Sequence, residues 1–323
     1  MDKFEGILPH RFIGYIYPRH VVDTLPYEMY RLLPDRVMMV QCPVSLKKFT
    51  REDVDAALAP LDRYVKMLVG RKVNVIVHGG VPLTLFQGCA EHDAMLAKIH
   101  RDTGLPVTST TEQIVDACKH LGLRKVAIGN KWKPGMNESL AKYFERKGVG
   151  VTGINCLDME LEKYENMDFD EHTELVYEIG KKALQDNPDA DGLYLGGGSM
   201  VSYPVVEVLE REFGKPVVLN CTALAWGLSR LMGVWEPRPG PCNSGRRVME
   251  IAGIDLKSLE GVSDLNTSVD QRPLLFQPLT IRGVTFRNRV LVPAMSQYMS
   301  PPGTGMPTDW HLVHLSQFAM GGA

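Results

Sequence analysis

The stretch VIVHGGVPLT at residues 75–84 decides the fold class, and LYLGGGSMVS at residues 193–202 repeats its pattern. In each stretch a short apolar run ends in glycines, and a segment of different periodicity follows. Short apolar runs that alternate with helical segments are typical of a parallel sheet with helices on both faces. The sequence therefore predicts an α/β fold.

The same pattern continues along most of the chain. Strands are expected at residues 12–17, 37–41, 73–78, 125–129, 150–154, 192–195 and 216–219. Helices, whose apolar residues recur three and four positions apart, are expected at residues 52–68, 137–147, 171–184 and 204–213. These elements place the α/β domain in residues 1–250, with a linker at residues 251–272.

A weak internal repeat runs through this domain. After each glycine-rich stretch comes a Gly-x-Pro-Val edge that ends one helix and begins a short strand, in TGLPVTSTTEQIVDA and in FGKPVVLNCTALAW. Thr110 or Thr222 is then placed to cap the next helix. The repeat favours two similar, flavodoxin-like lobes with a cleft between them. The alternative is a chance similarity of sequence within a generic alternating α/β fold.

Composition limits the possible partners. The chain has 323 residues, 44% of them hydrophobic and 23% charged, with a formal net charge of −2. Acidic and basic residues are interspersed, which argues against a nucleic-acid or anionic membrane partner. No apolar run approaches the roughly 20 residues that span a bilayer, and the first residues lack the apolar core of a signal peptide. We expect a cytoplasmic protein that binds a small molecule, with a homo-oligomer left open.

The six cysteines are scattered without a Cys-x-x-Cys pair, which argues against a disulfide framework or a structural zinc site. Reduced, mostly buried thiols are expected, and no metal site is predicted. Cys221 stands at the start of a predicted helix, where the helix N-terminus would lower the pKa of the thiol.

Two glycine-rich turns are the main candidate site, His78-Gly79-Gly80-Val81 and Gly196-Gly197-Gly198-Ser199. At the carboxyl end of a parallel strand, such turns direct backbone N–H groups at an anion, assisted by the following helix. Two turns facing one cleft would bind a carboxylate from both sides. The alternatives are that the glycines merely end strands, or that they bind a dinucleotide, but neither turn forms Gly-x-Gly-x-x-Gly with a suitable acidic residue.

Residues 13–234 resemble the aspartate/glutamate racemase superfamily, in particular arylmalonate decarboxylases and maleate isomerases. The motifs that carry the resemblance are IGYIYP, GGVPLTLFQG, TGLPVTSTTEQIVDACKHLGLRKVAIG, MNESLAKYFERKGV, DADGLYLGGG and FGKPVVLNCTALAW. The resemblance implies a cofactor-independent enzyme that moves a proton next to a carboxylate, with cysteines on one or both lobes. By motif alignment these cysteine positions fall on Gly80 and Gly197, which cannot move a proton.

Other residues are therefore candidates for the chemistry. Arg19 follows the first predicted strand and is suited to hold a carboxylate, while His20 or His78 would move the proton. Trp132 stands where the resemblance implies a tyrosine. Further substrate contacts are predicted at Gly79, Gly80, Val81, Gly197, Gly198 and Ser199, although Pro82 after the first turn has no N–H to donate.

Residues 273–323 resemble the beginning of old yellow enzyme flavoproteins, through the motifs LFQPLTIRG, FRNR and DWHLVHL. The resemblance implies an eightfold barrel of roughly 250 residues, of which this segment is an incomplete piece. One strand does not enclose a flavin, so no cofactor is predicted for the chain.

Three functions stay open from the sequence. The chain is a decarboxylase or isomerase of a small carboxylate that works without a thiol at Gly80 and Gly197, or it is a carboxylate-binding domain without catalysis. The third is the first domain of a fusion with a flavin-dependent ene-reductase.

Overall fold

The computed structural model describes residues 8–19, 24–34, 36–46, 50–159, 167–197 and 201–234, with short stretches after residue 278. The chain divides into two compact units, Met1–Leu259 and Glu260–Ala323, and each is described by itself. His20, Gly198, Ser199 and Cys242 lie outside the described residues.

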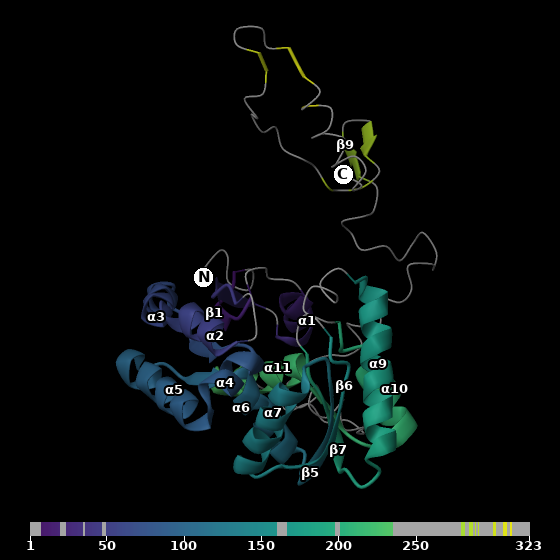
Figure 1. The fold of residues 1–323 in the computed structure, drawn as a ribbon. Helices are drawn as coiled ribbons and strands as arrows, with labels where there is room; N and C mark the ends of the chain where they lie inside the picture. Colours follow the sequence, from purple (N-terminus) through teal and green to yellow (C-terminus); the bar gives the residue numbers. More distant parts are fainter. Residues whose placement is uncertain are drawn as a thin grey trace. The chain divides into compact units, whose positions relative to one another are not determined.

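The first unit contains two parallel sheets of four strands each (Figure 1). The first sheet has the order β2-β1-β3-β4 and the second has the order β6-β5-β7-β8. The strands of the first sheet are β1 (Arg11–Tyr17), β2 (Val37–Pro43), β3 (Val75–His78) and β4 (Val107–Ser109). Those of the second are β5 (Lys125–Asn130), β6 (Gly150–Cys156), β7 (Gly192–Leu195) and β8 (Val217–Leu219). Since both orders place the second strand outside the first, the two lobes share one topology, as the internal repeat predicts.

Helices cover both sheets. The first lobe carries α1 (Thr24–Leu32), α2 (Arg51–Leu58), α3 (Leu61–Gly70), α4 (Val81–Gln87), α5 (Cys89–Thr103) and α6 (Thr110–His120). The second carries α7 (Pro134–Arg146), α9 (Phe169–Asp186), α10 (Val205–Phe213) and α11 (Asn220–Leu231). In Figure 1, α9 and α10 lie side by side, and α9 packs on β5, β6 and β7.

The two lobes are joined through equivalent helices. The helix after the last strand of each sheet, α6 and α11, packs against its counterpart, and α1 packs on α11. Gly227 allows this approach, because a Cβ atom at that position would overlap the carboxamide of Gln113. One apolar core runs through both lobes, from Ile13 on β1 to Tyr194 on β7. The relative position of the two lobes is therefore fixed by packing.

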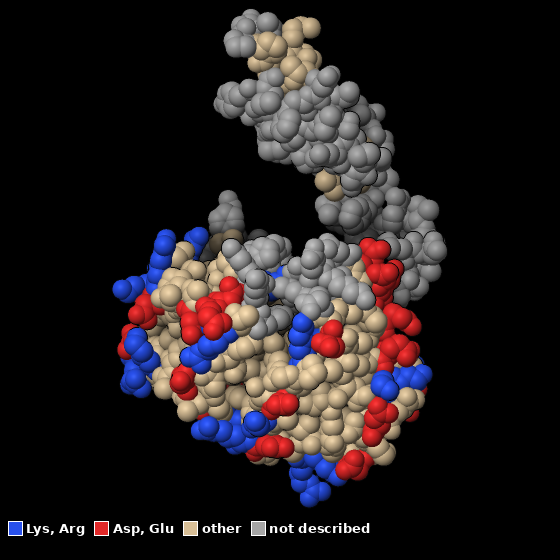
Figure 2. Space-filling model, viewed as in Figure 1, with Lys and Arg blue, Asp and Glu red and all other residues tan. Residues whose placement is uncertain are grey.

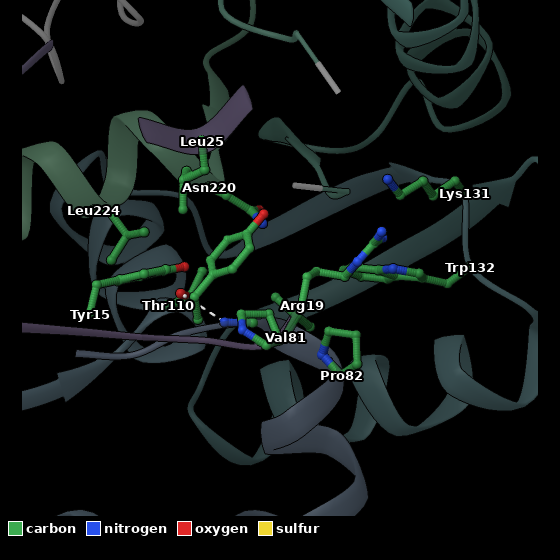
Figure 3. Close-up of a pocket in the computed structure, with 13 residues that line it drawn as sticks. Tyr15, Arg19, Leu25, Val81, Pro82, Thr110, Lys131, Trp132, Asn220 and Leu224 are labelled. Carbon is green, nitrogen blue, oxygen red and sulfur yellow. Dashed lines mark hydrogen bonds between the residues drawn. The ribbon is translucent and has the colours of Figure 1, made fainter. Parts of the chain in front are cut away.

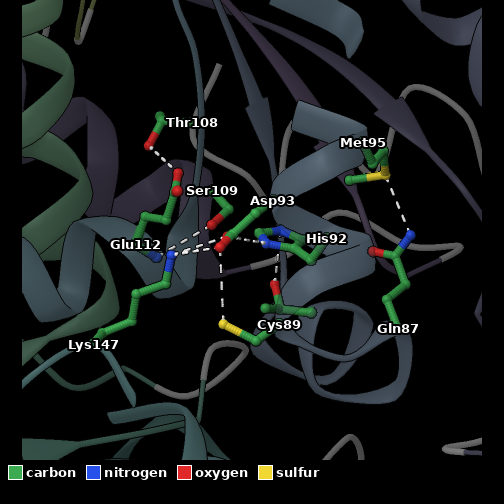
Figure 4. A network of polar contacts seen from close by, with 10 residues as sticks. Gln87, Cys89, His92, Asp93, Met95, Thr108, Ser109, Glu112 and Lys147 are labelled. Carbon is green, nitrogen blue, oxygen red and sulfur yellow. Dashed lines mark hydrogen bonds and ion pairs between the residues drawn. The ribbon is translucent and has the colours of Figure 1, made fainter. Parts of the chain in front are cut away.

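Two polar contacts also cross between the lobes. Lys147 Nζ lies 2.9 and 3.0 Å from the carboxylate oxygens of Asp93 on α5, in the network of Figure 4. Glu28 on α1 accepts hydrogen bonds from the backbone N–H groups of Ser202 and Tyr203, just before α10. Glu28 is buried, and its hydrogen bonds hold α1 against the loop that leads to α10.

Most elements agree with the sequence prediction, and the seven expected strands are found within two residues of their predicted ends. The helix expected at residues 52–68 is wrong as a single element. It is two helices, α2 and α3, separated at Pro60, which has no N–H for the helical ladder and whose ring would meet the carbonyl of the preceding turn.

The cap prediction is also corrected in part. Ser109 caps α6 by accepting a hydrogen bond from the Glu112 N–H at 3.1 Å, so Thr110 is the first residue of the helix rather than its cap. Thr222 lies inside α11 and accepts a hydrogen bond from the Leu219 N–H at 3.1 Å, which supports the start of that helix.

The second unit contains an antiparallel hairpin of β9 (Leu279–Ile281) and β10 (Val284–Phe286), in which Val284 pairs with Ile281. The proposed boundaries at residues 250 and 272 stay predictions.

On the face in Figure 2, groups of Lys and Arg lie beside groups of Asp and Glu mainly toward the margins of the first unit, and other residues form much of the face between them. Among the described helices, none is long and apolar enough to cross a membrane.

Candidate active site

A cavity lies where the carboxyl ends of the two sheets meet (Figure 3). It is lined by Tyr15, Tyr17, Pro18, Arg19, Leu25, Gly80, Val81, Pro82, Thr110, Lys131, Trp132, Asn220 and Leu224. A second cavity adjoins it and shares Leu25, Lys131 and Asn220 with it. The carboxyl ends of parallel strands are where α/β proteins bind their ligands. The two cavities are therefore the candidate active site.

Equivalent positions of the two lobes face this site. Arg19 lies two residues after β1, and Trp132 lies two residues after β5, the equivalent strand. Gly80 lies two residues after β3, and Gly197 lies two residues after β7. The strand ends of each lobe thus contribute one large side chain and one glycine to the site.

Two buried cations line the first cavity. Arg19 is 6% exposed and Lys131 is 2% exposed, and both side chains line the cavity. Among the described residues that line it, none is Asp or Glu. Buried cations with an adjoining cavity attract an anion, because charge interactions strengthen away from water. The cavity is suited to a carboxylate.

The apolar residues complete the lining. Trp132, Leu25, Val81 and Leu224 give the cavity an apolar wall beside the two cations. Such a combination of apolar surface and few charged groups fits a small anion with a hydrophobic substituent.

The first glycine turn donates its N–H groups within the protein. The Gly79 N–H bonds to the Ile16 carbonyl at 2.9 Å, and the Gly80 N–H bonds to Thr110 Oγ1 at 3.3 Å. In the second turn, the Gly196 N–H bonds to the Gly129 carbonyl at 2.8 Å. In these described residues, the side-chain cations rather than the three glycine N–H groups are the main partners for an anion.

Both glycines that face the site have left-handed backbone conformations. Gly80 has φ of 88°, and a Cβ atom there would lie 2.6 Å from Cγ of Pro18. Gly197 has φ of 128°, and a Cβ atom there would lie 3.3 Å from Cε of Lys131. Since L side chains rarely adopt such φ values, a cysteine at either position would be strained.

Thr110 connects the first turn to the core. Its hydroxyl accepts from the Gly80 N–H and is also hydrogen bonded to the Tyr15 phenol. Burial raises the pKa of Tyr15 well above its usual value, with the Thr110 bond acting weakly against this. Tyr15 is thus a neutral hydroxyl group at physiological pH.

Glu28 lies in the wall of the second cavity, with Gly196 and Gly197. Its Oε1 accepts hydrogen bonds from the Ser202 N–H at 2.7 Å, the Ser202 hydroxyl at 3.1 Å and the Tyr203 N–H at 3.0 Å. Burial raises the pKa of the Glu28 carboxyl, although these donors act in the opposite direction. This carboxyl is mainly a link between the lobes.

The expectation of a low pKa for Cys221 is wrong. Burial raises the pKa of this thiol well above its usual value, and the nearby Glu28 carboxyl raises it further. The side chain is 1% exposed, so the effect of the helix N-terminus is outweighed by loss of water and by a neighbouring negative charge. Cys42, Cys89, Cys118 and Cys156 are free thiols, as is Cys221.

His78 does not line either cavity. It is fully buried at the end of β3, with its ring 5.3 Å from the ring of His92 on α5. Burial lowers the pKa of His78 to about 3, and the neighbouring His92 contributes to this. His92 in turn lies 3.2 Å from Thr84 Oγ1, and burial lowers its pKa to about 4. The structure thus does not bring His78 to the site that the sequence predicts for it.

The structure brings together four of the predicted substrate contacts in the first cavity, namely Arg19, Gly80, Val81 and Trp132, and places Gly197 in the second. Gly79 lies behind them and lines neither cavity. Three lining residues, Lys131, Asn220 and Glu28, were not predicted from the sequence, and Thr110 was predicted only as a helix cap. Lys131 and Asn220 each come directly after a strand, at β5 and β8, and this position is the signal that points to them.

A two-lobed α/β protein with a cavity lined by two buried cations at its strand ends is the class that this fold and site define. The family model for arylmalonate decarboxylase matches residues 13–242, and the chain belongs to the arylmalonate decarboxylase family.

Individual relatives agree with this assignment. The chain is 28% identical to arylmalonate decarboxylase from Bordetella bronchiseptica over 230 residues, which cover 71% of this chain and 93% of that protein. It is 22% identical to maleate isomerase from Geobacillus stearothermophilus over 234 residues, 70% of this chain and 88% of that protein. A crystal structure of arylmalonate decarboxylase superposes with a TM-score of 0.61 at 26% identity, covering 71% of this chain and 96% of that one. The predicted resemblance to this superfamily is confirmed.

A shorter match concerns flavoproteins. Over 41 residues the chain is 51% identical to an NADH:flavin oxidoreductase from Gibberella zeae, which is 13% of this chain and 9% of that protein. Because so little of the flavoprotein is covered, the relation of residues 273–323 to old yellow enzyme is supported only by a short stretch.

Within the described residues, no group of three or more His, Cys, Asp or Glu side chains is arranged to hold a metal ion.

Proposed function

We propose that the first unit decarboxylates or isomerises a small carboxylate by proton transfer, without a cofactor and without a thiol at Gly80 or Gly197. The observation that carries the proposal is the pair of buried cations, Arg19 and Lys131, beside an apolar wall in a family of carboxylate-converting enzymes. Arg19 would bind one carboxylate group, and Trp132 would pack on the substituent of the substrate. Gly80, Val81, Gly197, Gly198 and Ser199 stay the predicted surroundings of the bound anion, whereas Gly79 lines neither cavity.

The group that moves the proton is the open part of this proposal. The sequence predicts His20 or His78 for this role. His20 lies outside the described residues and stays a candidate for the base. His78 would have to leave its place against His92 to reach the cavity, which makes it the weaker candidate.

A panel of substrates tests the proposal. The purified full chain is incubated with phenylmalonate, methyl-phenylmalonate, maleate and aspartate in deuterated water, and products are followed by NMR. We expect loss of carbon dioxide or isomerisation from at least one compound, with deuterium at the reacting carbon. Clear binding of these carboxylates without turnover or deuterium exchange would contradict catalysis.

That contrary outcome defines the second candidate function. A non-catalytic carboxylate-binding domain is favoured by one observation, the glycines at both positions where the family resemblance implies cysteine. For a longer parent chain, the short flavoprotein match supports a fusion in which the first unit supplies an ene-reductase with substrate.

A further inference from the structure

The two lobes differ at one position where their topology is otherwise equivalent. Pro18 is the first residue after β1, and Lys131 is the first residue after β5. Pro18 packs on Gly80, within 2.6 Å of where a Cβ would lie, and Lys131 packs on Gly197, within 3.3 Å. In each lobe the residue after the first strand thus covers the glycine after the third strand. In the first lobe that residue is an inert ring, and in the second it carries an amine.

Lys131 fills the space that a side chain at position 197 would otherwise enter. The Cε, Cδ and Cγ atoms of Lys131 lie 3.3, 3.4 and 3.5 Å from the Cβ position of Gly197. The aliphatic chain therefore lies along the second turn. In Figure 3 the amine end of Lys131 is turned toward the side of the cavity where Leu25 and Asn220 lie.

The position of Lys131 is also central. With Leu25 and Asn220, it is one of three described residues that line both cavities. It is 2% exposed, so its amine works out of bulk water. A group at the junction of the two cavities reaches a substrate that is bound in the first and extends toward Gly197.

The other polar groups around the cavities are less suited to exchange a proton. Arg19 presents a planar guanidinium, which suits it to binding a carboxylate. The pKa of Tyr15 is raised by burial, and its hydroxyl is bonded to Thr110. One carboxylate oxygen of Glu28 already accepts three hydrogen bonds. A lysine ammonium carries a transferable proton, as catalytic lysines show, and Lys131 lines both cavities.

We propose that Lys131 is the catalytic proton donor of this site and delivers its proton to the reacting carbon from the side of Gly197. The inference rests on the proposed function, which it makes specific. In decarboxylation of a malonate, the bond between the central carbon and one carboxylate breaks, and carbon dioxide leaves. The electron pair stays on the central carbon and is delocalised into the remaining carboxylate as an enediolate. The Lys131 ammonium gives a proton to that carbon, a C–H bond forms, and the neutral amine regains a proton from water.

Arg19 and Lys131 then have separate roles. Arg19 holds the carboxylate that remains on the product, because its planar guanidinium binds both oxygens and keeps its proton. Lys131 supplies the proton that the reaction consumes. An enediolate carries more negative charge on carbon than the substrate does, so the ammonium also stabilises the developing charge.

The test is Lys131→Met in the full chain, with phenylmalonate as substrate. Methionine keeps the aliphatic contact with Gly197 and removes the amine. General acid catalysis contributes on the order of 100- to 10,000-fold to a rate. We expect kcat to fall at least about 100-fold, with a smaller change in KM, while Lys142→Met, an exposed lysine on α7, keeps the wild-type rate.

Two further measurements separate a proton donor from a structural role. The wild-type kcat should fall at high pH as the donor loses its proton. This decrease, the high-pH limb of the pH–rate profile, should be absent from the residual rate of Lys131→Met. Lys131→Arg retains length and charge but does not release a proton. Lys131→Arg should therefore bind phenylmalonate and have a low kcat. This variant also tests the role of Lys131 if Lys131→Met folds poorly.

The outcomes distinguish the two proposals. Turnover by the wild-type chain with an undiminished kcat in Lys131→Met or Lys131→Arg would overturn the role of Lys131 alone. The role of Lys131 would also be overturned if Tyr17→Phe lost the high-pH limb and Lys131→Met kept it. The Tyr17 phenol would then be the proton donor. No turnover of any compound by the wild-type chain would overturn the proposed function and the role of Lys131 with it.

Discussion

Arg19 and Trp132 occupy equivalent places in the two lobes, two residues after the first strand of each sheet. The same backbone position therefore supplies a cation from the first lobe and an apolar ring from the second. A substrate with a carboxylate and an apolar substituent would be oriented by this difference. Equivalent backbone positions that carry different side chains would therefore fix the orientation of a bound substrate.

Arg19 is expected to act on substrate binding more than on the chemical step. A hydrogen bond to a charged group contributes about 1.5–3 kcal/mol, so Arg19→Met should raise KM for phenylmalonate by roughly 10- to 100-fold. Steady-state kinetics of Arg19→Met and of the exposed control Arg63→Met check this. An unchanged KM in Arg19→Met would show that Arg19 does not contact the substrate.

His78 is expected to be dispensable for turnover. Because it is fully buried against His92 and lines neither cavity, His78→Leu should keep kcat/KM within about threefold of the wild-type value, as distant substitutions usually do. The measurement is the rate with phenylmalonate for a variant shown by circular dichroism to be folded. A loss of more than about 100-fold would establish His78 as the base that the sequence suggested.

Lys131 shows why the residues of the site could be predicted from the sequence only in part. A lysine directly after a strand ordinarily reaches solvent with its charged end. Lys131 packs on the second turn and shares a cavity wall with residues of α1 and α11, all of which are far away in the sequence. Periodicity reports which face of its own element a residue occupies, and it does not report which distant element covers that residue.

At the scale of elements, the strands were predictable from the sequence, and the positions where helices are interrupted were less predictable. Runs such as VIVH and LYL are apolar and short, and buried parallel strands require this. The division of residues 52–68 at Pro60 was missed, because the apolar period continues across it. The junction of α6 and α11 left no periodic signal either, since it depends on a close approach at one glycine.

Gly227 tests that junction. A methyl group there would overlap the carboxamide of Gln113, whose Nε2 is held by Thr108 Oγ1 at 2.7 Å and has little freedom to move. We expect Gly227→Ala to lower the free energy of unfolding by about 1–3 kcal/mol, as overpacking usually does.

Gly135 is a matched control, since it also lies in a helix, α7, and has no atom near its Cβ position. Gly135→Ala should be neutral or stabilise the protein by up to about 1 kcal/mol, because alanine has the higher helix propensity. Urea denaturation of both variants measures the difference. Equal stability of the two would argue against the close packing of α6 on α11.

At the scale of the whole molecule, the cavity depends on how the lobes are held together. Its lining comes from both sheets, while the lobes are joined by a continuous apolar core, by the α6–α11 junction and by the Glu28 and Asp93 contacts. Two lobes were predictable from the repeat. Their common core was not, because the residues that form it are separated by most of the domain.

Stability should fall in acid because of His78. Its pKa is about 3 in the folded protein against an ordinary value of 6.5, so between these values the unfolded chain binds a proton that the folded chain does not. The free energy of unfolding therefore falls as the pH drops below about 6.5, and the loss continues toward pH 3. Between pH 7.5 and pH 5 this group alone should cost about 2 kcal/mol.

Buried carboxyls act in the opposite direction over part of this range. Burial raises the pKa values of Glu28 and Glu112, so these groups favour the folded state as the pH falls. The contribution of His78 is therefore read from a difference between variants. Urea denaturation at pH 7.5 and pH 5 measures how much the free energy of unfolding falls between these two pH values. This fall should be smaller in His78→Leu than in the wild-type chain by about 2 kcal/mol. The exposed control His100→Leu should keep the wild-type pH dependence, and an equal loss in His78→Leu would mean that His78 is not buried as a neutral ring.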